Sequence, residues 1–270
     1  MSLSEMYVNP LFQRLSLLTG LEVLHDLTRT KVIVFGLGGV GSWCAEALIR
    51  SGIGNISIAD SDTVCVTNIN RQVQATSLTI GQSKAEILKK RLAEIHPQCK
   101  ISAFGRVFSR ETADTFGIEQ ADYVIDAIDS LTYKLDLIEY ACHGGKTFFS
   151  SMGMAQKLDP TQLKTKDIWE TKGCPLARLV RSGLRKRGFT GHFTTVYSPE
   201  RLPLHREAET SCGSSQCLCP SHRGETVEWC GSKKVINGSV VTVTATAGMI
   251  LASLVIQDVY ARYEHGRSHE

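Results

Sequence analysis

The chain has 270 residues, of which 42% are hydrophobic, with 23 glycines and only 7 prolines. This composition suits one large α/β domain and excludes collagen-like, low-complexity and disordered chains. The net charge of +3 is too small to indicate a nucleic-acid partner by itself. The first residues, MSLSEMYVNP, lack a basic segment followed by an apolar one, so we expect no signal peptide and a cytoplasmic location. The nine cysteines are odd in number, and we expect reduced thiols.

Short apolar runs alternate with helix-like segments along the first 157 residues. A helical segment is predicted at residues 11–27. Strands are then predicted at residues 31–36, 55–60, 100–105, 121–129 and 147–152, and helices at residues 42–52, 81–97 and 131–145. Strict alternation of this kind predicts an α/β fold with a doubly wound, mainly parallel, Rossmann-like sheet.

The alternation stops near residue 158, where a basic, Cys-containing stretch begins. We predict four parts: an N-terminal helical segment (1–30), a core (31–157), an inserted irregular excursion (158–234) and a C-terminal strand and helix that complete the core (235–270). Residues 235–256 are long and apolar enough to span a bilayer, but their first two thirds are rich in polar and β-branched residues. We therefore expect a buried strand that runs into a buried helix, and no membrane association.

A glycine loop follows the first predicted strand. Gly36, Gly38 and Gly41 have the Gly-x-Gly-x-x-Gly spacing, and Gly39 adds a further glycine. Such a loop turns the backbone tightly and directs helix-start N–H groups at a phosphate, although a turn that only packs helix on strand remains the alternative. Asp60 ends the second strand, where an acid accepts ribose hydroxyl protons, and this suits NAD and ATP equally.

The segment after Asp60 contains groups that a dehydrogenase does not need. Residue 42 is Ser where a Walker A loop requires Lys, so the loop is not a P-loop. Cations and amides near a phosphate loop suit a triphosphate whose α-phosphorus is attacked, while a solvated helix face is the alternative for the two cations. The candidate residues are Asp62, Asn68, Asn70, Arg71, Gln72 and Lys84.

Two carboxylates lie at the end of the fourth predicted strand, where open α/β sheets bind ligands. Oxygen ligands of this kind can hold Mg²⁺ beside phosphates. Asp129 lies farther beyond the strand and is the better metal candidate. Asp126 is expected either to contact the nucleotide or to cap the following turn.

The motifs GLGGVGS, NINRQ, GQSKAE and DAIDS, in this order, resemble the adenylating core of the E1-like (ThiF-type) family. The resemblance implies that the glycine loop and Asp60 hold ATP and that a carboxylate attacks its α-phosphorus. It also implies catalytic roles for Arg71 and Lys84 at the phosphates and for Asp129 at Mg²⁺. Arg14, six residues before Gly20, resembles an arginine that reaches the ATP of a partner subunit, which implies a homodimer, while an ordinary arginine on a helix surface is the alternative.

Later motifs, including LDPTQL, PLARLVRSGLRKRG and GSVVTVTATAG, most resemble the tRNA threonylcarbamoyladenosine dehydratases within that family. The resemblance implies ATP-dependent cyclisation of the modified adenosine at position 37 of tRNA, with net loss of water. Residues 164–187 independently contain eight cations against two acids, a density that suits a phosphate backbone, although a solvated basic helix is the alternative. The candidate tRNA contacts are Arg178, Arg181, Arg185, Lys186 and Arg187.

The main alternative is an adenylyltransferase for a ubiquitin-like sulfur-carrier protein of the molybdopterin or thiamine type. Such activators often use Cys-x-x-Cys zinc ligands, which this chain lacks. Zinc at Cys212, Cys217, Cys219 and Cys230 is less expected than reduced thiols because their spacing is irregular. Cys174 lies roughly where thioester-forming relatives place a nucleophile, but ring closure needs none. A sulfur-transfer partner such as a cysteine desulfurase stays open, and a nucleotide-binding scaffold without chemistry is opposed only by the completeness of the motif set.

Overall fold

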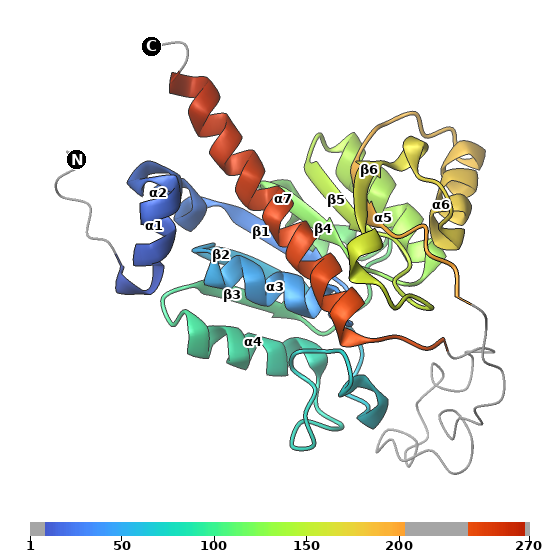
Figure 1. Ribbon diagram of the computed structural model, residues 1–270, viewed down its shortest axis with the longest axis horizontal. Helices are drawn as coiled ribbons and strands as arrows, with labels where there is room; N and C mark the ends of the chain where they lie inside the picture. The colour runs from blue at the N-terminus through green and yellow to red at the C-terminus, as the bar shows by residue number, and fades with distance from the viewer. Residues whose placement is uncertain (1–8, 203–236, 268–270) are drawn as a thin grey trace.

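The computed structural model describes residues 9–202 and 237–267, whose strands form one seven-stranded sheet in the order β3-β2-β1-β4-β5-β7-β6 (Figure 1). All neighbouring strands are parallel except β6 and β7. The predicted doubly wound, mainly parallel α/β fold is therefore confirmed. The strands are β1 (Lys31–Phe35), β2 (Asn55–Ala59), β3 (Lys100–Phe104), β4 (Tyr123–Asp126), β5 (Thr147–Ser151), β6 (Lys164–Asp167) and β7 (Thr194–Tyr197).

Helices cover both faces of the sheet (Figure 1). One face packs against α2 (Leu21–Arg29), α3 (Gly41–Arg50), α4 (Lys84–Ile95) and the long α7 (Val241–Arg267). The other packs against α5 (Leu131–His143) and α6 (Pro175–Lys186). Single 3₁₀ turns connect these elements: η2 (Pro10–Phe12), η3 (Val66–Asn68), η4 (Ala113–Phe116), η5 (Ile118–Gln120), η6 (Pro160–Gln162) and η7 (Ile168–Glu170).

The carboxyl ends of β1, β2 and β4 lie side by side at one edge of the sheet. Phe35 at the end of β1 is in register with Ala59 of β2 and with Asp126 of β4. Strand order reverses between β1 and β4, which is where sheets of this type open a crevice for ligands. The glycine loop, Asp60 and the segment after Asp126 all begin at this edge.

The N-terminal segment differs from the single predicted helix at 11–27. It is divided at Gly20 into α1 (Gln13–Thr19) and α2. Gly20 has φ of +89°, a backbone conformation that side chains with a Cβ rarely adopt. The chain therefore turns between two short helices.

The first part of the predicted irregular excursion has regular secondary structure. Residues 158–202 contain β6, α6 and β7, and the two strands extend the same sheet, with Lys164 in register with Tyr197 and Asp167 with Thr194. No apolar run predicted β6 because it is an edge strand whose first three residues are exposed. The rest of the predicted excursion, residues 203–234, lies outside the described part.

The predicted C-terminal strand is wrong within the described residues, because Val241 already begins α7 and residues 237–240 form no strand. Helix α7 is long and apolar enough to cross a membrane by length and composition. Its buried face nevertheless packs with the core, so the expected buried helix is confirmed. A Cβ on Gly248 would lie 2.5 Å from the Val40 carbonyl oxygen, so this glycine permits the close crossing of α7 and α3. Such packing outweighs the β propensity of the VTVT sequence.

Candidate active site

The glycine loop joins β1 to α3 and has one packed side and one open side. Gly36 has φ of +85°, and a Cβ there would lie 2.7 Å from the Ala127 carbonyl oxygen beyond β4. A Cβ on Gly41 would collide with the Gly36 carbonyl oxygen. A Cβ on Gly38, by contrast, would meet no atom within 4 Å. Gly36 and Gly41 therefore shape the loop, and Gly38 leaves room for a phosphate to approach the backbone.

Asp60 fixes the glycine loop to the end of β2. Its Oδ2 accepts a hydrogen bond from the Leu37 N–H at 2.6 Å, and its Oδ1 accepts one from the Asp62 N–H at 2.8 Å. Burial raises the pKa of the Asp60 carboxyl, and the Lys84 ammonium opposes that shift. A carboxylate held in this way keeps lone pairs for ribose hydroxyls at the edge of the loop.

Lys84 is the first residue of α4 and is buried, with Nζ 2.7 Å from Oδ2 of Asp62 and 4.0 Å from Oδ1 of Asp60. Ser83 caps the same helix end by accepting the Glu86 N–H. Burial alone would lower the pKa of the Lys84 ammonium, but Asp60, Asp62 and Asp129 outweigh it, so the pKa is raised. The Lys84 ammonium therefore stays positively charged, and it lies beside carboxylate oxygens of Asp60 and Asp62.

Arg71 follows η3 and lies across the glycine loop. Its Cγ is 3.1 Å from the position of a Cβ on Gly39, and its guanidinium donates to the Thr67 carbonyl at 2.8 Å and to Asn70 Oδ1 at 3.0 Å. Asn70 in turn donates to the Ser239 carbonyl at 2.9 Å, which ties this segment to the residues before α7. Burial lowers the pKa of Arg71, and Asp129 partly offsets this.

Asp129 is exposed beyond β4, and its charge acts on both Arg71 and Lys84. Three predicted residues from three distant segments are thus brought within electrostatic reach of one another beside the glycine loop. Two cations and one exposed carboxylate suit a phosphate chain with a divalent cation, because Mg²⁺ typically takes one or two carboxylates plus phosphate oxygens and water.

Asp126 occupies a different environment from Asp129. It is fully buried and accepts hydrogen bonds from Lys134 Nζ at 2.5 Å, Ser150 Oγ at 2.6 Å and the Ile128 N–H at 3.0 Å. Lys134 also donates to the Ser151 carbonyl at 3.0 Å. The N–H bond is the turn-capping contact named above as the alternative. This placement favours that alternative over a contact with the nucleotide.

Two other candidate residues are buried in the segment around Arg71, residues 65–74, which we call the Arg71 segment. Asn68 is buried, and its Oδ1 accepts the Cys65 N–H at 3.0 Å, which closes the η3 turn. Gln72 is also buried, and its Oε1 has no hydrogen-bond partner among the described residues. Asn68 therefore acts on the shape of the segment that bears Arg71.

Three further side chains attach the Arg71 segment to the loop, and no sequence motif predicts them. Trp43 Nε1 donates to the Arg71 carbonyl at 3.0 Å, Ser42 Oγ accepts the Val73 N–H at 3.3 Å, and Gln74 Nε2 donates to the Leu37 carbonyl at 2.8 Å. Each bond joins residues about 30 positions apart and uses a backbone partner, so no motif spacing records it. Thr244 of α7 also lies close to Gly39, with its Oγ1 3.0 Å from the position of a Cβ on that glycine.

Arg14 lies away from the glycine loop of its own chain. It is exposed on α1, which packs where α3 ends, with Leu15 and Phe12 near Gly52. The parallel strands of the sheet begin at that end. The glycine loop lies at the opposite end, at the carboxyl ends of these strands, where α3 begins (Figure 1). Arg14 therefore does not join the site of its own chain.

The cysteines predicted as a less expected zinc site, Cys212, Cys217, Cys219 and Cys230, lie outside the described residues. Within residues 9–202 and 237–267, no three His, Cys, Asp or Glu side chains are grouped to hold a metal ion. Cys174 is buried at the start of α6.

Comparison with known proteins agrees with this geometry. The ThiF family model matches residues 12–266. The tRNA threonylcarbamoyladenosine dehydratase of Bacillus subtilis is 35% identical over 249 residues, which are 92% of this chain and 94% of that protein. The enzyme of the same name from Escherichia coli is 32% identical over 253 residues, 91% of each chain. A crystal structure of the E. coli enzyme in complex with ATP superposes with a TM-score of 0.79 at 29% identity, covering 96% of this chain and 99% of that one. The chain therefore belongs to the ThiF family.

Proposed function

We propose that the chain uses ATP to cyclise N6-threonylcarbamoyladenosine at position 37 of tRNA. The convergence of Arg71, Lys84 and Asp129 beside the open face of Gly38 is the observation that most supports adenylation. The tRNA substrate is supported by the names of relatives that match the chain over nearly its whole length.

The proposed reaction has two steps. An oxygen of the threonine carboxylate attacks the α-phosphorus of ATP, a P–O bond forms, and pyrophosphate leaves. The carbamoyl oxygen then attacks the activated acyl carbon, the bond from that carbon to the adenylate oxygen breaks, and AMP leaves. The carbamoyl N–H loses its proton as the ring forms. The oxygen lost from the nucleoside ends in AMP, so the nucleoside loses the elements of water.

The residues of the site fit ATP in distinct roles. The loop at Gly38 and the carboxylate of Asp60 would hold the α-phosphate and the ribose. Arg71 and Lys84 would neutralise charge on the phosphates as pyrophosphate departs, in a partly buried site where such charges act strongly. Mg²⁺ held at Asp129 would supply further neutralisation.

A homodimer is the proposed assembly. Next to Arg14 on α1, Leu17 and Leu18 are 83% and 79% exposed, and Leu11 nearby is also exposed. A second copy of the chain would cover this apolar patch and receive Arg14 at its own nucleotide. Mixing an Arg14→Ala protein with an Arg71→Ala protein tests this, because a hybrid dimer has one complete site only if Arg14 acts on its partner. Recovery of activity on mixing supports the dimer, and no recovery after verified subunit exchange contradicts it.

Exchange of labelled pyrophosphate into ATP tests the choice of carboxylate. We expect exchange to depend on tRNA that bears N6-threonylcarbamoyladenosine and to be absent with the unmodified transcript. Exchange with a carrier protein that ends in Gly-Gly, but not with the modified tRNA, would replace the proposal by sulfur-carrier activation. A cysteine desulfurase partner stays a prediction.

A further inference from the structure

We infer that the solvent-facing side of α6 is the surface on which the tRNA backbone docks, and that only part of the basic stretch contributes to it. We call the exposed side chains of Arg178, Arg185 and Lys186 the α6 basic face. The inference rests on the proposed function, because it concerns the same substrate. It adds the location and the residues of contact.

Helical spacing places the three cations on one side. Residues three, four and seven apart share a helix face, and Arg178, Ser182, Arg185 and Lys186 follow that spacing. All four are exposed, together with Pro175 and Leu179, whereas the opposite side is buried through Ala177, Val180 and Leu184. No acidic residue occurs between Pro175 and Arg187. The face is therefore positive without local compensation from its own helix.

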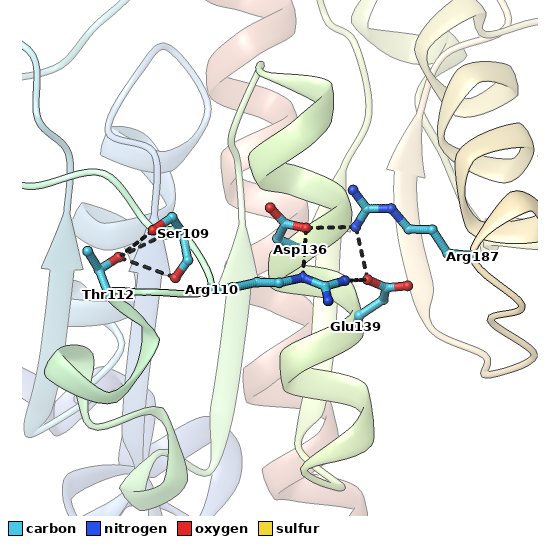
Figure 2. A network of polar contacts seen from close by, with 6 residues as sticks. All are labelled: Ser109, Arg110, Thr112, Asp136, Glu139 and Arg187. Carbon is cyan, nitrogen blue, oxygen red and sulfur yellow. Dashed lines mark hydrogen bonds and ion pairs between the residues drawn. The ribbon is translucent and has the colours of Figure 1, made fainter.

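Two other arginines of the same stretch are occupied by the protein. Arg187 lies 2.7 Å from Asp136 and 2.9 Å from Glu139 on α5, and Arg110 approaches the same two acids from the other side (Figure 2). Figure 2 shows the two guanidinium groups converging on this acidic pair from different segments. Arg187 therefore fastens the end of α6 to α5.

Arg181 has a similar structural task at the middle of α6. It is half-buried and donates a hydrogen bond to Thr171 Oγ1, which lies in the turn before the helix. Both Arg181 and Arg187 were candidate tRNA contacts by charge alone. Their partners separate them from the α6 basic face.

Arg185 is held in an orientation that suits RNA. Its guanidinium lies over the Trp169 ring, 5.3 Å from the ring centroid, and the Trp169 indole is fixed by donating to the Gly191 carbonyl at 2.9 Å. This contact with the ring restrains the Arg185 side chain while leaving its N–H groups for phosphate oxygens. Restraining a long side chain in advance lowers the entropy lost on binding.

The position of α6 connects this face with the active site. Its first turn packs beside the carboxyl end of β5, since a Cβ on Gly153 would lie 3.3 Å from Leu176 Cβ. This is the same edge of the sheet as the glycine loop. The helix then runs away from that edge for about 18 Å at 1.5 Å per residue. Helix α6 therefore begins at the same end of the sheet as the glycine loop, and we place the backbone next to the bound nucleotide along its exposed side.

The test compares two triple variants of the full-length protein. One removes the face (Arg178→Ala, Arg185→Ala, Lys186→Ala), and the matched control removes three cations from α4 and β3 on the far side of the sheet order (Lys89→Ala, Lys90→Ala, Lys100→Ala). Binding of tRNA is measured at several salt concentrations, and KM is measured for tRNA and for ATP.

We expect the face variant to bind tRNA more weakly at every salt concentration and the slope of log K against log salt to fall by about two to three, since each phosphate contact contributes about 0.7 to 0.9. KM for tRNA should rise, while KM for ATP and the melting temperature stay at wild-type values. The control variant should keep the wild-type slope apart from a small uniform effect of net charge.

The outcomes separate this inference from the proposed function. If wild-type protein binds tRNA through the face but does not cyclise the nucleoside, the proposed function fails and the docking surface stands. If the face and control variants bind tRNA alike, the docking surface is wrong even when wild-type protein is active. No tRNA binding by wild-type protein, or face-dependent binding only to phosphatidylserine vesicles, would overturn the inference as well.

Discussion

The indole Nε1 of Trp43 donates a hydrogen bond to the carbonyl oxygen of Arg71 at 3.0 Å. Trp43 belongs to α3, the helix that follows the glycine loop, so this bond fixes the position of the Arg71 segment relative to the loop. Replacing Trp43 by Phe should lower kcat for adenylation about fivefold, the equivalent of about 1 kcal/mol for one hydrogen bond. KM for tRNA should not change. Pyrophosphate exchange measures the effect, and an unchanged kcat would show that Arg71 is positioned without this bond.

Two glycines of the same loop should respond differently to a methyl group. Gly38→Ala should leave the free energy of unfolding unchanged and raise KM for ATP, because the new Cβ meets no protein atom but stands where a phosphate would approach. Gly41→Ala should cost about 1–3 kcal/mol of stability, because the Cβ collides with the Gly36 carbonyl oxygen. Urea unfolding and ATP titration separate the two effects. Wild-type ATP affinity in Gly38→Ala would place the phosphates elsewhere.

The buried pair of Lys134 and Asp126 should govern stability. Lys134→Met leaves a fully buried carboxylate without its cation and should lower the free energy of unfolding by about 3–5 kcal/mol. The double variant Asp126→Asn with Lys134→Met should recover much of this loss, since neither charge remains. Chemical denaturation of the single and double variants tests the coupling. Equal stability of the two variants would contradict it.

His96 should make stability depend on pH. It is buried against Phe12, with ring centroids 4.9 Å apart, and its Nδ1 has no hydrogen-bond partner among the described residues. Burial lowers the pKa of His96 in the folded chain. As pH falls below about 6.5, the unfolded chain therefore gains a proton more readily than the folded one, and stability decreases. His96→Phe should remove this part of the slope in unfolding experiments between neutral pH and pH 5. Parallel curves for the two proteins would refute the assignment.

The sequence predicted the parallel sheet because β1, β2, β4 and β5 are apolar runs bounded by glycines and acids. It missed β6 and β7 as members of that sheet. Strand β6 lacks an apolar pattern because it is a Lys-containing edge strand, and β7 is only four residues long. It also predicted a strand at residues that enter α7, where packing of Gly248 against α3 outweighs local propensity. Tertiary context decides such segments, and a single sequence does not contain it.

For the candidate site too, the sequence predicted some residues, and only the structure showed how others are placed. Arg71, Lys84 and Asp129 belong to local motifs, so their types and order pointed to a phosphate site before their proximity was known. Asp126 and Asp129 are alike in sequence, yet one is buried with Lys134 and the other is exposed, a difference set by the turn after β4. Charge alone did not distinguish the arginines of the basic stretch. In the structure, Arg181 and Arg187 bond to other residues of the protein, whereas Arg178 and Arg185 are exposed.

Mass spectrometry of nucleosides tests the proposed cyclisation itself. Wild-type protein, ATP, Mg²⁺ and tRNA that bears N6-threonylcarbamoyladenosine are incubated together, and Asp129→Ala is run in parallel. We expect the nucleoside to lose the mass of one water with the wild-type protein, with AMP formed in equal amount. We expect no loss with Asp129→Ala, whose melting temperature should match the wild type because Asp129 is exposed. An unchanged nucleoside mass with wild-type protein and intact modified tRNA would show that the chain does not cyclise this nucleoside.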